Sequence, residues 1–96
     1  MYQVFIWEAT GTVGALVSSG MEAEKIHEKG GADVSINIDQ MNRMHYVMSF
    51  DSWEAWGKYM ARQANDEEWN AFVAEASQRQ IATLTKVWRL NLMQFE

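Results

Sequence analysis

The sequence contains no cysteine and no proline. Without cysteine, the chain cannot form a disulfide, use a thiolate nucleophile or bind a metal through sulfur. Without proline, the ends of helices and strands have to be marked by glycine, asparagine and aspartate. The chain also lacks a long apolar run, and its mean hydropathy of −0.32 is far too low for a membrane span. We therefore expect no membrane partner.

Positive charge is scarce as well. The chain has 8 Lys and Arg against 13 Asp and Glu, which gives a net charge of −5. The basic residues are scattered singly, whereas nucleic-acid binding needs them clustered, so no nucleic-acid partner is expected. No histidine and carboxylate cluster has metal-ligand spacing, and there is no glycine-rich phosphate loop, so we expect no metal and no cofactor. The segment MYQVFIWEA has neither a basic region nor a long apolar run, which predicts no signal peptide and a cytoplasmic location.

The length and the hydrophobic content are those of one globular domain. The chain has 96 residues, of which 48% are hydrophobic, and it includes five tryptophans. This predicts a single domain over residues 1–96. A monomer of this size buries only about two-thirds of the surface that its unfolded chain exposes, so a partner subunit would add stability.

Residues with a two-residue alternation predict strands over 2–8, 32–39 and 43–50. The first of these, YQVFIWE, is apolar on both faces, so both faces should be covered. The other two are separated by three residues, which predicts a hairpin. Matching their apolar faces pairs Asp39 with Arg43 and leaves Asn42 in a left-handed conformation. The same register pairs Ile38 with Met44, Asn37 with His45, and Ile36 with Tyr46.

Helix-forming residues predict a helix from about 12 to 29, which Gly30 and Gly31 would end with a left-handed residue. His27 lies in its last turn, where a positive charge suits the helix dipole, and this favours a structural role. In RMHYVMSFDSWEAWGKYM the alternation gives way to helical spacing, with Asp51 as the predicted N-cap.

A second start signal at Asn65 indicates that this second helix is broken or kinked near 64–66. From Ile81 to Phe95, β-branched and aromatic residues return in a run too long for one straight strand. That strand must bend, bulge or reach beyond its own subunit.

The order of the elements is β-α-β-β-α-β, the α+β ferredoxin-like pattern of a four-stranded antiparallel sheet with two helices on one face. The segment GADVSINIDQMNRMHYVMSFDSWEAWGKYM, together with EEWNAFVAE, resembles the dimeric α/β-barrel superfamily. That superfamily includes antibiotic-biosynthesis-type monooxygenases and NIPSNAP-like domains. The resemblance implies a homodimer in which the two sheets face each other, but fold alone does not decide an activity.

Large side chains on the inward faces of the third strand and of both halves of the second helix predict an apolar cleft for a small apolar or aromatic ligand. The alternative is that these side chains are simply core. The predicted mouth is the helix break at Asn65–Asp66. The predicted wall residues are Tyr46, Met48, Trp56, Met60, Trp69 and Phe72.

His45 and Asn37 are the only catalytic candidates, and they face away from this cleft. His45 would carry a proton in a polar pocket, or it is a hydrogen-bonded structural histidine. Three functions stay open: a small-molecule binding protein, which the separation of the two residue sets favours; a cofactor-independent monooxygenase or isomerase that uses His45, Asn37 and Trp69; and a structural homodimer without a ligand. In the superfamily, haem-degrading members use an asparagine on the first strand and a histidine on the second helix, whereas this chain offers only Gln3 on the first strand and no histidine in the second helix region.

Overall fold

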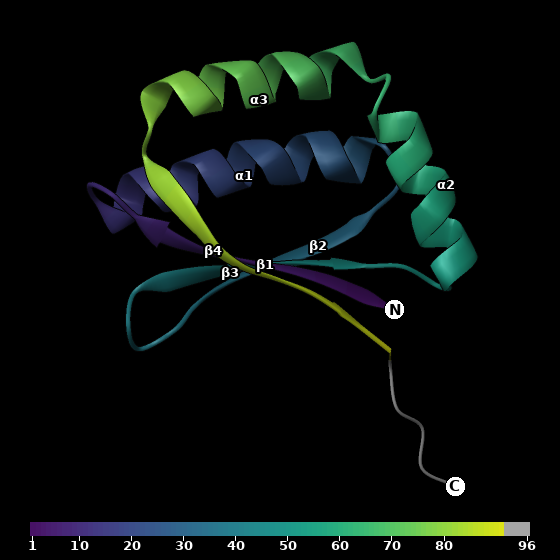
Figure 1. Cartoon of the computed structure of the whole chain (residues 1–96), viewed down its shortest axis with the longest axis horizontal. Helices are drawn as coiled ribbons and strands as arrows, with labels where there is room; N and C mark the ends of the chain where they lie inside the picture. Colours follow the sequence, from purple (N-terminus) through teal and green to yellow (C-terminus); the bar gives the residue numbers. More distant parts are fainter. Residues whose placement is uncertain (92–96) are drawn as a thin grey trace, which may run out of the picture.

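A four-stranded antiparallel sheet carries three helices on one side (Figure 1). The structure is a computed structural model, and it describes residues 1–91. The predicted α+β class, the strand order along the chain and the antiparallel sheet are confirmed. In the sheet, the strands lie in the order β2-β3-β1-β4. The elements are β1 (Tyr2–Ala9), α1 (Val13–Lys29), β2 (Asp33–Ile38), β3 (Arg43–Ser49), α2 (Trp53–Gln63), α3 (Glu67–Arg79) and β4 (Ala82–Leu90).

The β2–β3 hairpin has the predicted register. Asn37 pairs with His45, and Ile36 pairs with Tyr46. The backbone N–H of Asp39 donates to the carbonyl of Arg43, and Asn42 has a φ of 60°. Asparagine tolerates this left-handed conformation better than most residues do, which is why it closes the turn.

The last strand contains the bulge that its length implied. Ile6 pairs with Lys86 but Trp7 pairs with Leu84, so Thr85 is an extra residue on β4. Its hydroxyl donates to the carbonyl of Ile6 over 3.0 Å. The strand ends at Leu90, and the rest of the predicted run, residues 92–95, lies outside the described residues.

The helix boundaries agree with the sequence at α1 and differ by one residue at the other two helices. Gly31 has a φ of 99°, as predicted for the residue after the α1 C-cap. The α2 N-cap is Ser52 and not Asp51: the Ser52 side chain accepts from the backbone N–H of Ala55. Likewise, Asp66 and not Asn65 caps α3.

The predicted single kinked helix is two separate helices. Asp66 has extended backbone, with φ −81° and ψ 111°, and its side chain accepts from the N–H of Trp69. A capping residue in this conformation ends one helix and begins another. The two helices therefore run in different directions: α3 lies beside α1 above the sheet, and α2 closes one end (Figure 1).

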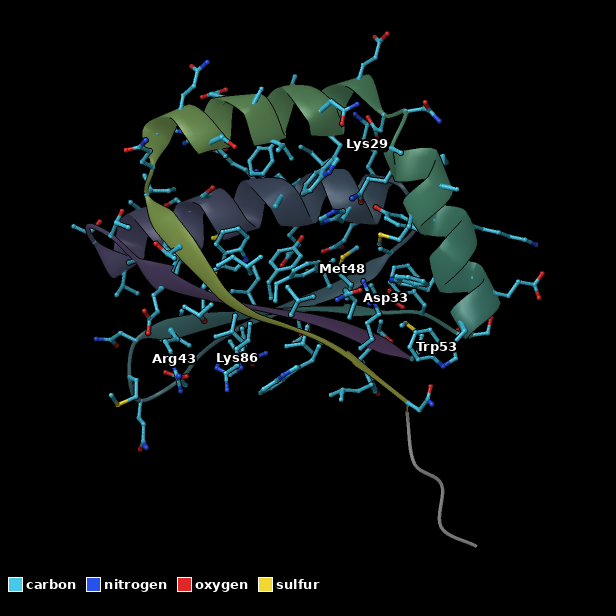
Figure 2. All side chains as sticks on the ribbon, viewed as in Figure 1. Lys29, Asp33, Arg43, Met48, Trp53 and Lys86 are labelled. Carbon is cyan, nitrogen blue, oxygen red and sulfur yellow. The ribbon has the colours of Figure 1, made fainter. Side chains whose placement is uncertain are left out.

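The core lies between α1 and the central strands. Met48 points from β3 toward the helices, whereas Arg43 and Lys86 point to the opposite side of the sheet (Figure 2). Gly20 allows α1 to approach β3 closely, because a Cβ there would come within 2.7 Å of the Met44 sulfur. The buried cluster consists of Leu16, Ala23, Ala32, Met44, Tyr46 and Met48. Among the described helices, none is long and apolar enough to cross a membrane.

The face of the sheet away from the helices is partly shielded by the chain itself. Val4 and Ile6 are 7% and 3% exposed there, because cross-strand neighbours such as Val47 cover them. Trp88 and Leu90 on the edge strand β4 are 44% and 48% exposed. The apolar surface left on this side therefore lies mainly on β4.

Candidate functional site

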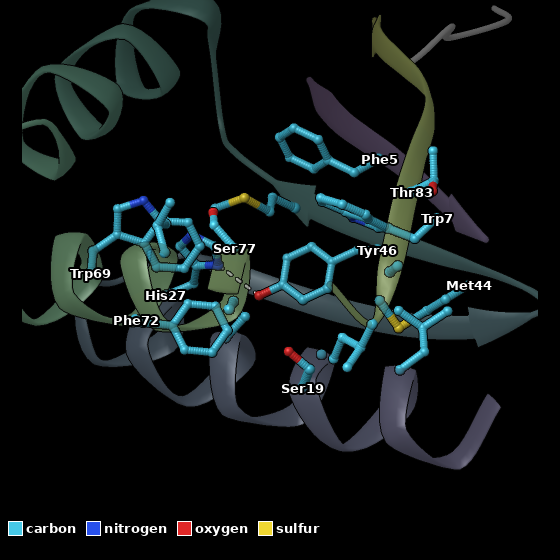
Figure 3. Close-up of a pocket in the computed structure, with 18 of the residues that line it drawn as sticks. Phe5, Trp7, Ser19, His27, Met44, Tyr46, Trp69, Phe72, Ser77 and Thr83 are labelled. Carbon is cyan, nitrogen blue, oxygen red and sulfur yellow. Dashed lines mark hydrogen bonds between the residues drawn. The ribbon is translucent and has the colours of Figure 1, made fainter. Parts of the chain in front are cut away.

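A cavity of about 680 Å³ lies between the sheet and the helices (Figure 3). The sheet supplies its floor, α1 and α3 supply two walls, and the end of α2 contributes at one end. None of the described residues that line it carries a formal charge at neutral pH. Its principal lining residues are Phe5, Trp7, Leu16, Ser19, His27, Met44, Tyr46, Met48, Met60, Gln63, Trp69, Phe72, Val73, Ser77, Gln80 and Thr83.

The cavity brings together five of the six predicted wall residues, namely Tyr46, Met48, Met60, Trp69 and Phe72. The exception is Trp56, whose indole N–H donates to Gln3 Oε1 over 3.1 Å. The Arg89 guanidinium also lies over the Trp56 ring, 5.0 Å from its centroid. Trp56 therefore belongs to a polar cluster at the end of β1. The predicted mouth residues Asn65 and Asp66 do not line the cavity either.

Phe5 and Trp7 also line the cavity, although the sequence analysis did not predict them as wall residues. Phe5 pairs with Tyr46, and Trp7 pairs with Met44, so both side chains lie on the helix-covered face of the sheet. Their alternation in β1 was visible in the sequence. What the sequence did not show is that β1 pairs with β3 in this register, because that pairing joins segments about 40 residues apart.

His27 is the polar centre of the site. It is 3% exposed, and its Nδ1 lies 2.6 Å from the hydroxyl of Tyr46, which is 4% exposed (Figure 3). The Trp69 ring packs on the imidazole, with 4.1 Å between centroids, and Phe72 stacks on Trp69 at 5.4 Å. Elements α1, β3 and α3 thus meet at one histidine.

Helix α2 fixes the same histidine from another side. The Tyr59 hydroxyl donates to the backbone carbonyl of His27 over 3.1 Å. The Arg62 guanidinium donates to the carbonyl of Gly30, one turn further on. The His27 carbonyl also accepts from the backbone N–H groups of Gly30 and Ala32, so the Tyr59 bond adds a tertiary contact to a helix end that is already capped. The position of His27 is therefore set by tertiary contacts and not by the helix alone.

Burial keeps His27 uncharged. It lowers the pKa of His27 to about 4, although the nearby Gln63 side chain and the charge of Asp66 act in the opposite direction. Burial also raises the pKa of Tyr46 well above its usual range. His27 therefore adds no positive charge to the end of α1 at neutral pH. The site instead presents a neutral imidazole and a protonated phenol.

Two polar atoms beside the cavity make no well-formed hydrogen bond among the described residues, although the Gln63 side chain lies close enough to His27 to raise the pKa of its imidazole. They are Nε2 of His27 and Oε1 of Gln63, and both are buried. Buried polar atoms are nearly always paired, because an unpaired one costs about 1–3 kcal/mol. Both residues line the cavity. A bound molecule could supply the missing partners.

His45 and Asn37 lie on the other face of the sheet, as predicted. His45 Nε2 is 2.8 Å from Asp39 Oδ2, which also accepts from Arg43 Nε at 2.9 Å. Asp39 Oδ1 accepts from the backbone N–H groups of Met41 and Arg43, and His45 and these bonds hold the pKa of Asp39 well below its usual range. His45 is thus paired within the hairpin turn. Neither His45 nor Asn37 shares a cavity with Trp69.

Residues 1–91 contain no group of three or more His, Asp or Glu side chains placed to hold a metal ion. No family model matches the chain, and no curated protein matches its sequence. The resemblance to the dimeric α/β-barrel superfamily therefore stays a prediction, and the fold and the cavity have to supply the functional argument.

Proposed function

We propose that this protein binds a small, uncharged apolar or aromatic molecule in the cavity between its sheet and its helices. The observation that carries the proposal is the cavity itself, about 680 Å³ in volume and lined by aromatic rings and methionines. Known small-molecule pockets span about 300–1,000 Å³ and are mainly apolar, with a few polar groups. Methionine adds walls that adjust to the shape of a ligand.

Trp69 should be a main contact for the ligand. Replacing it (Trp69→Ala) removes the ring that packs between His27 and Phe72, so the protein should bind naphthalene at least about tenfold more weakly, a loss of about 1.4 kcal/mol. Isothermal titration calorimetry with naphthalene measures this.

Two variants outside the cavity serve as controls. Trp56→Ala makes the same truncation at a tryptophan that does not line the cavity, and His45→Ala changes the opposite face of the sheet. Both should bind naphthalene within about threefold of the wild type. If neither naphthalene nor the more polar 2-quinolone binds the wild-type protein, the binding proposal is wrong, and a structural role without a ligand becomes the better interpretation.

We also propose that the protein is a homodimer that buries the sheet face opposite the helices, in keeping with the superfamily it resembles. Supporting this, Trp88 and Leu90 expose apolar surface there, and no described helix covers that face (Figure 1). A stable dimer of this kind would bury more than about 1,200 Å² in total.

The dimer can be tested with two neighbouring positions on β4. Trp88 and Val87 are each 44% exposed but point to opposite faces, because Trp88 pairs with Val4 and Val87 with Phe5. Trp88→Glu should therefore produce monomers in light scattering, whereas Val87→Glu should stay dimeric. A wild-type protein that is monomeric at micromolar concentration would contradict the proposal.

A cofactor-independent oxygenase or isomerase is the second candidate. One observation favours it: His27 and Tyr46 form a polar pair in an otherwise apolar cavity. These two residues, and not His45 and Asn37, would then have to move the protons. However, with the pKa of His27 lowered to about 4, its imidazole is a weak base at neutral pH. Binding is therefore ranked above catalysis.

A further inference from the structure

The polar end of the cavity has a defined hydrogen-bonding pattern. His27 Nδ1 lies 2.6 Å from the Tyr46 hydroxyl. We assign the phenol as the donor to Nδ1 and the ring proton of the neutral imidazole to Nε2, because the contact with the Gln63 side chain favours a proton on the nitrogen that faces it. Gln63 Oε1 is an acceptor that lies near the imidazole without a well-formed hydrogen bond to it. The pair therefore offers one donor, from α1, and one acceptor, from α2.

A ligand that fits this pair must accept one hydrogen bond and donate one. A lactam or another N–H next to a C=O does so with two neighbouring atoms, and a hydroxyl does so with one. An ether, a ketone or a tertiary amide can only accept, and would leave Gln63 Oε1 unpaired. A pure hydrocarbon would leave both buried atoms without a well-formed hydrogen bond, which costs affinity.

Charge on the ligand is disfavoured at the same end. The cavity lining that the structure describes contains no Asp, Glu, Lys or Arg, and the imidazole is neutral. A carboxylate or ammonium would lose its hydration without gaining a partner of opposite charge. The hydrogen-bonding group of the ligand should thus be uncharged.

The surroundings favour a flat body attached to this group. Trp69 packs against His27 and Phe72, and Phe5 lies 6.5 Å from Tyr46 between ring centroids. In Figure 3, Trp69 and Phe72 lie beside His27 at the same end of the cavity. A planar ring can stack on such faces at typical aromatic separations of about 4.5–7 Å.

We propose that His27 and Gln63 are specificity-determining residues, which select an uncharged, flat ligand with a hydrogen-bond donor next to an acceptor. This inference rests on the proposed binding function and adds to it the chemical class of the ligand. The ligand's acceptor would receive the Nε2–H of His27, and its donor would bind Oε1 of Gln63. No covalent step is involved.

Three probes of similar size test this with the full-length protein. 2-Quinolone presents N–H beside C=O, N-methyl-2-quinolone keeps only the acceptor, and naphthalene has neither group. By calorimetry, the wild type should bind 2-quinolone about tenfold more tightly than its N-methyl analogue, since the latter leaves a buried acceptor unpaired. 2-Naphthoate, which is charged, should bind most weakly of the aromatic probes.

The Gln63→Leu variant removes the acceptor while keeping a side chain of similar size. In this variant, the ratio of the affinity for 2-quinolone to the affinity for its N-methyl analogue should fall close to one. Gln78→Leu is the control, because it makes the same substitution at an exposed glutamine of α3 that does not line the cavity. It should keep the wild-type preference.

Each outcome has one interpretation. If naphthalene binds and the wild type does not distinguish the two quinolones, the selection is wrong while the binding function stands. If the preference persists in Gln63→Leu, another group reads the ligand and the assignment to Gln63 is wrong. If none of the probes binds, the proposed function fails together with the inference.

Discussion

Between pH 6.5 and pH 4, the free energy of unfolding is expected to fall by about 3 kcal/mol because of His27 alone. The unfolded chain binds a proton on this imidazole with a pKa near 6.5, whereas burial lowers the pKa in the folded protein to about 4. Between these values the unfolded state holds more protons, so acid favours unfolding. The contribution is fully present above pH 6.5 and fully lost below pH 4.

Urea unfolding at a series of pH values measures this effect. In His27→Gln the part of the pH dependence that falls between 6.5 and 4 should disappear, whatever the variant's stability at pH 7. Ser77→Ala is the control, because Ser77 lines the same cavity as His27 but does not titrate. It should keep the wild-type pH dependence. Equal pH dependence in the wild type and His27→Gln would contradict the burial of a neutral imidazole.

The hairpin could be predicted in detail because its determinants are local. Two alternating segments have one register that matches their apolar faces, and a three-residue loop with Asn42 closes it. Asp39 then completes the turn by accepting from Met41 and Arg43, both within four residues. Neither long-range packing nor a partner subunit was needed to reach this result.

The helix caps show where local information became ambiguous. Asp51 and Ser52 are both good N-cap residues, as are Asn65 and Asp66. The choice between neighbours depends on where the preceding segment places the backbone, and that is set by the sheet and by α1. The same limit explains why a single kinked helix was predicted in place of two helices. The two start signals were visible in the sequence, but the change in direction between α2 and α3 was not.

In the candidate site too, the features set by local sequence were predicted, and those set by long-range packing were not. Tyr46 and Met48 were predicted as cavity walls because their faces follow from the alternation in β3. Trp56 was predicted because it shares a helix face with Met60, and the actual direction of α2 turns it toward Gln3 instead. His27 was interpreted from its place in α1 alone. Its burial comes from Tyr59 and Trp69, which are more than 30 residues away in the sequence.

Met48 is expected to carry the largest single side-chain contribution to stability. It is 1% exposed, and it lies on the central strand β3 between Gln3 of β1 and Val34 of β2. Met48→Ala should therefore lower the free energy of unfolding by about 2–5 kcal/mol. Domains of this kind have total stabilities of only about 5–15 kcal/mol, so the variant should unfold at a much lower urea concentration.

The size of this loss depends on what surrounds Met48. Because Met48 borders the existing cavity, its truncation enlarges that cavity and leaves the walls without new contacts. Met48→Leu nearly conserves the volume and should cost less than about 1.5 kcal/mol. Val47→Ala is the positional control: Val47 is the next residue on β3, but it is only half-buried and faces the other side of the sheet. If Val47→Ala destabilised the protein as much as Met48→Ala does, the placement of the core on the helix-covered face of the sheet would be contradicted.

If Met48→Ala destabilised the protein and also bound larger aromatic probes, the Met48 side chain would be shown both to stabilise the fold and to limit the size of the ligand.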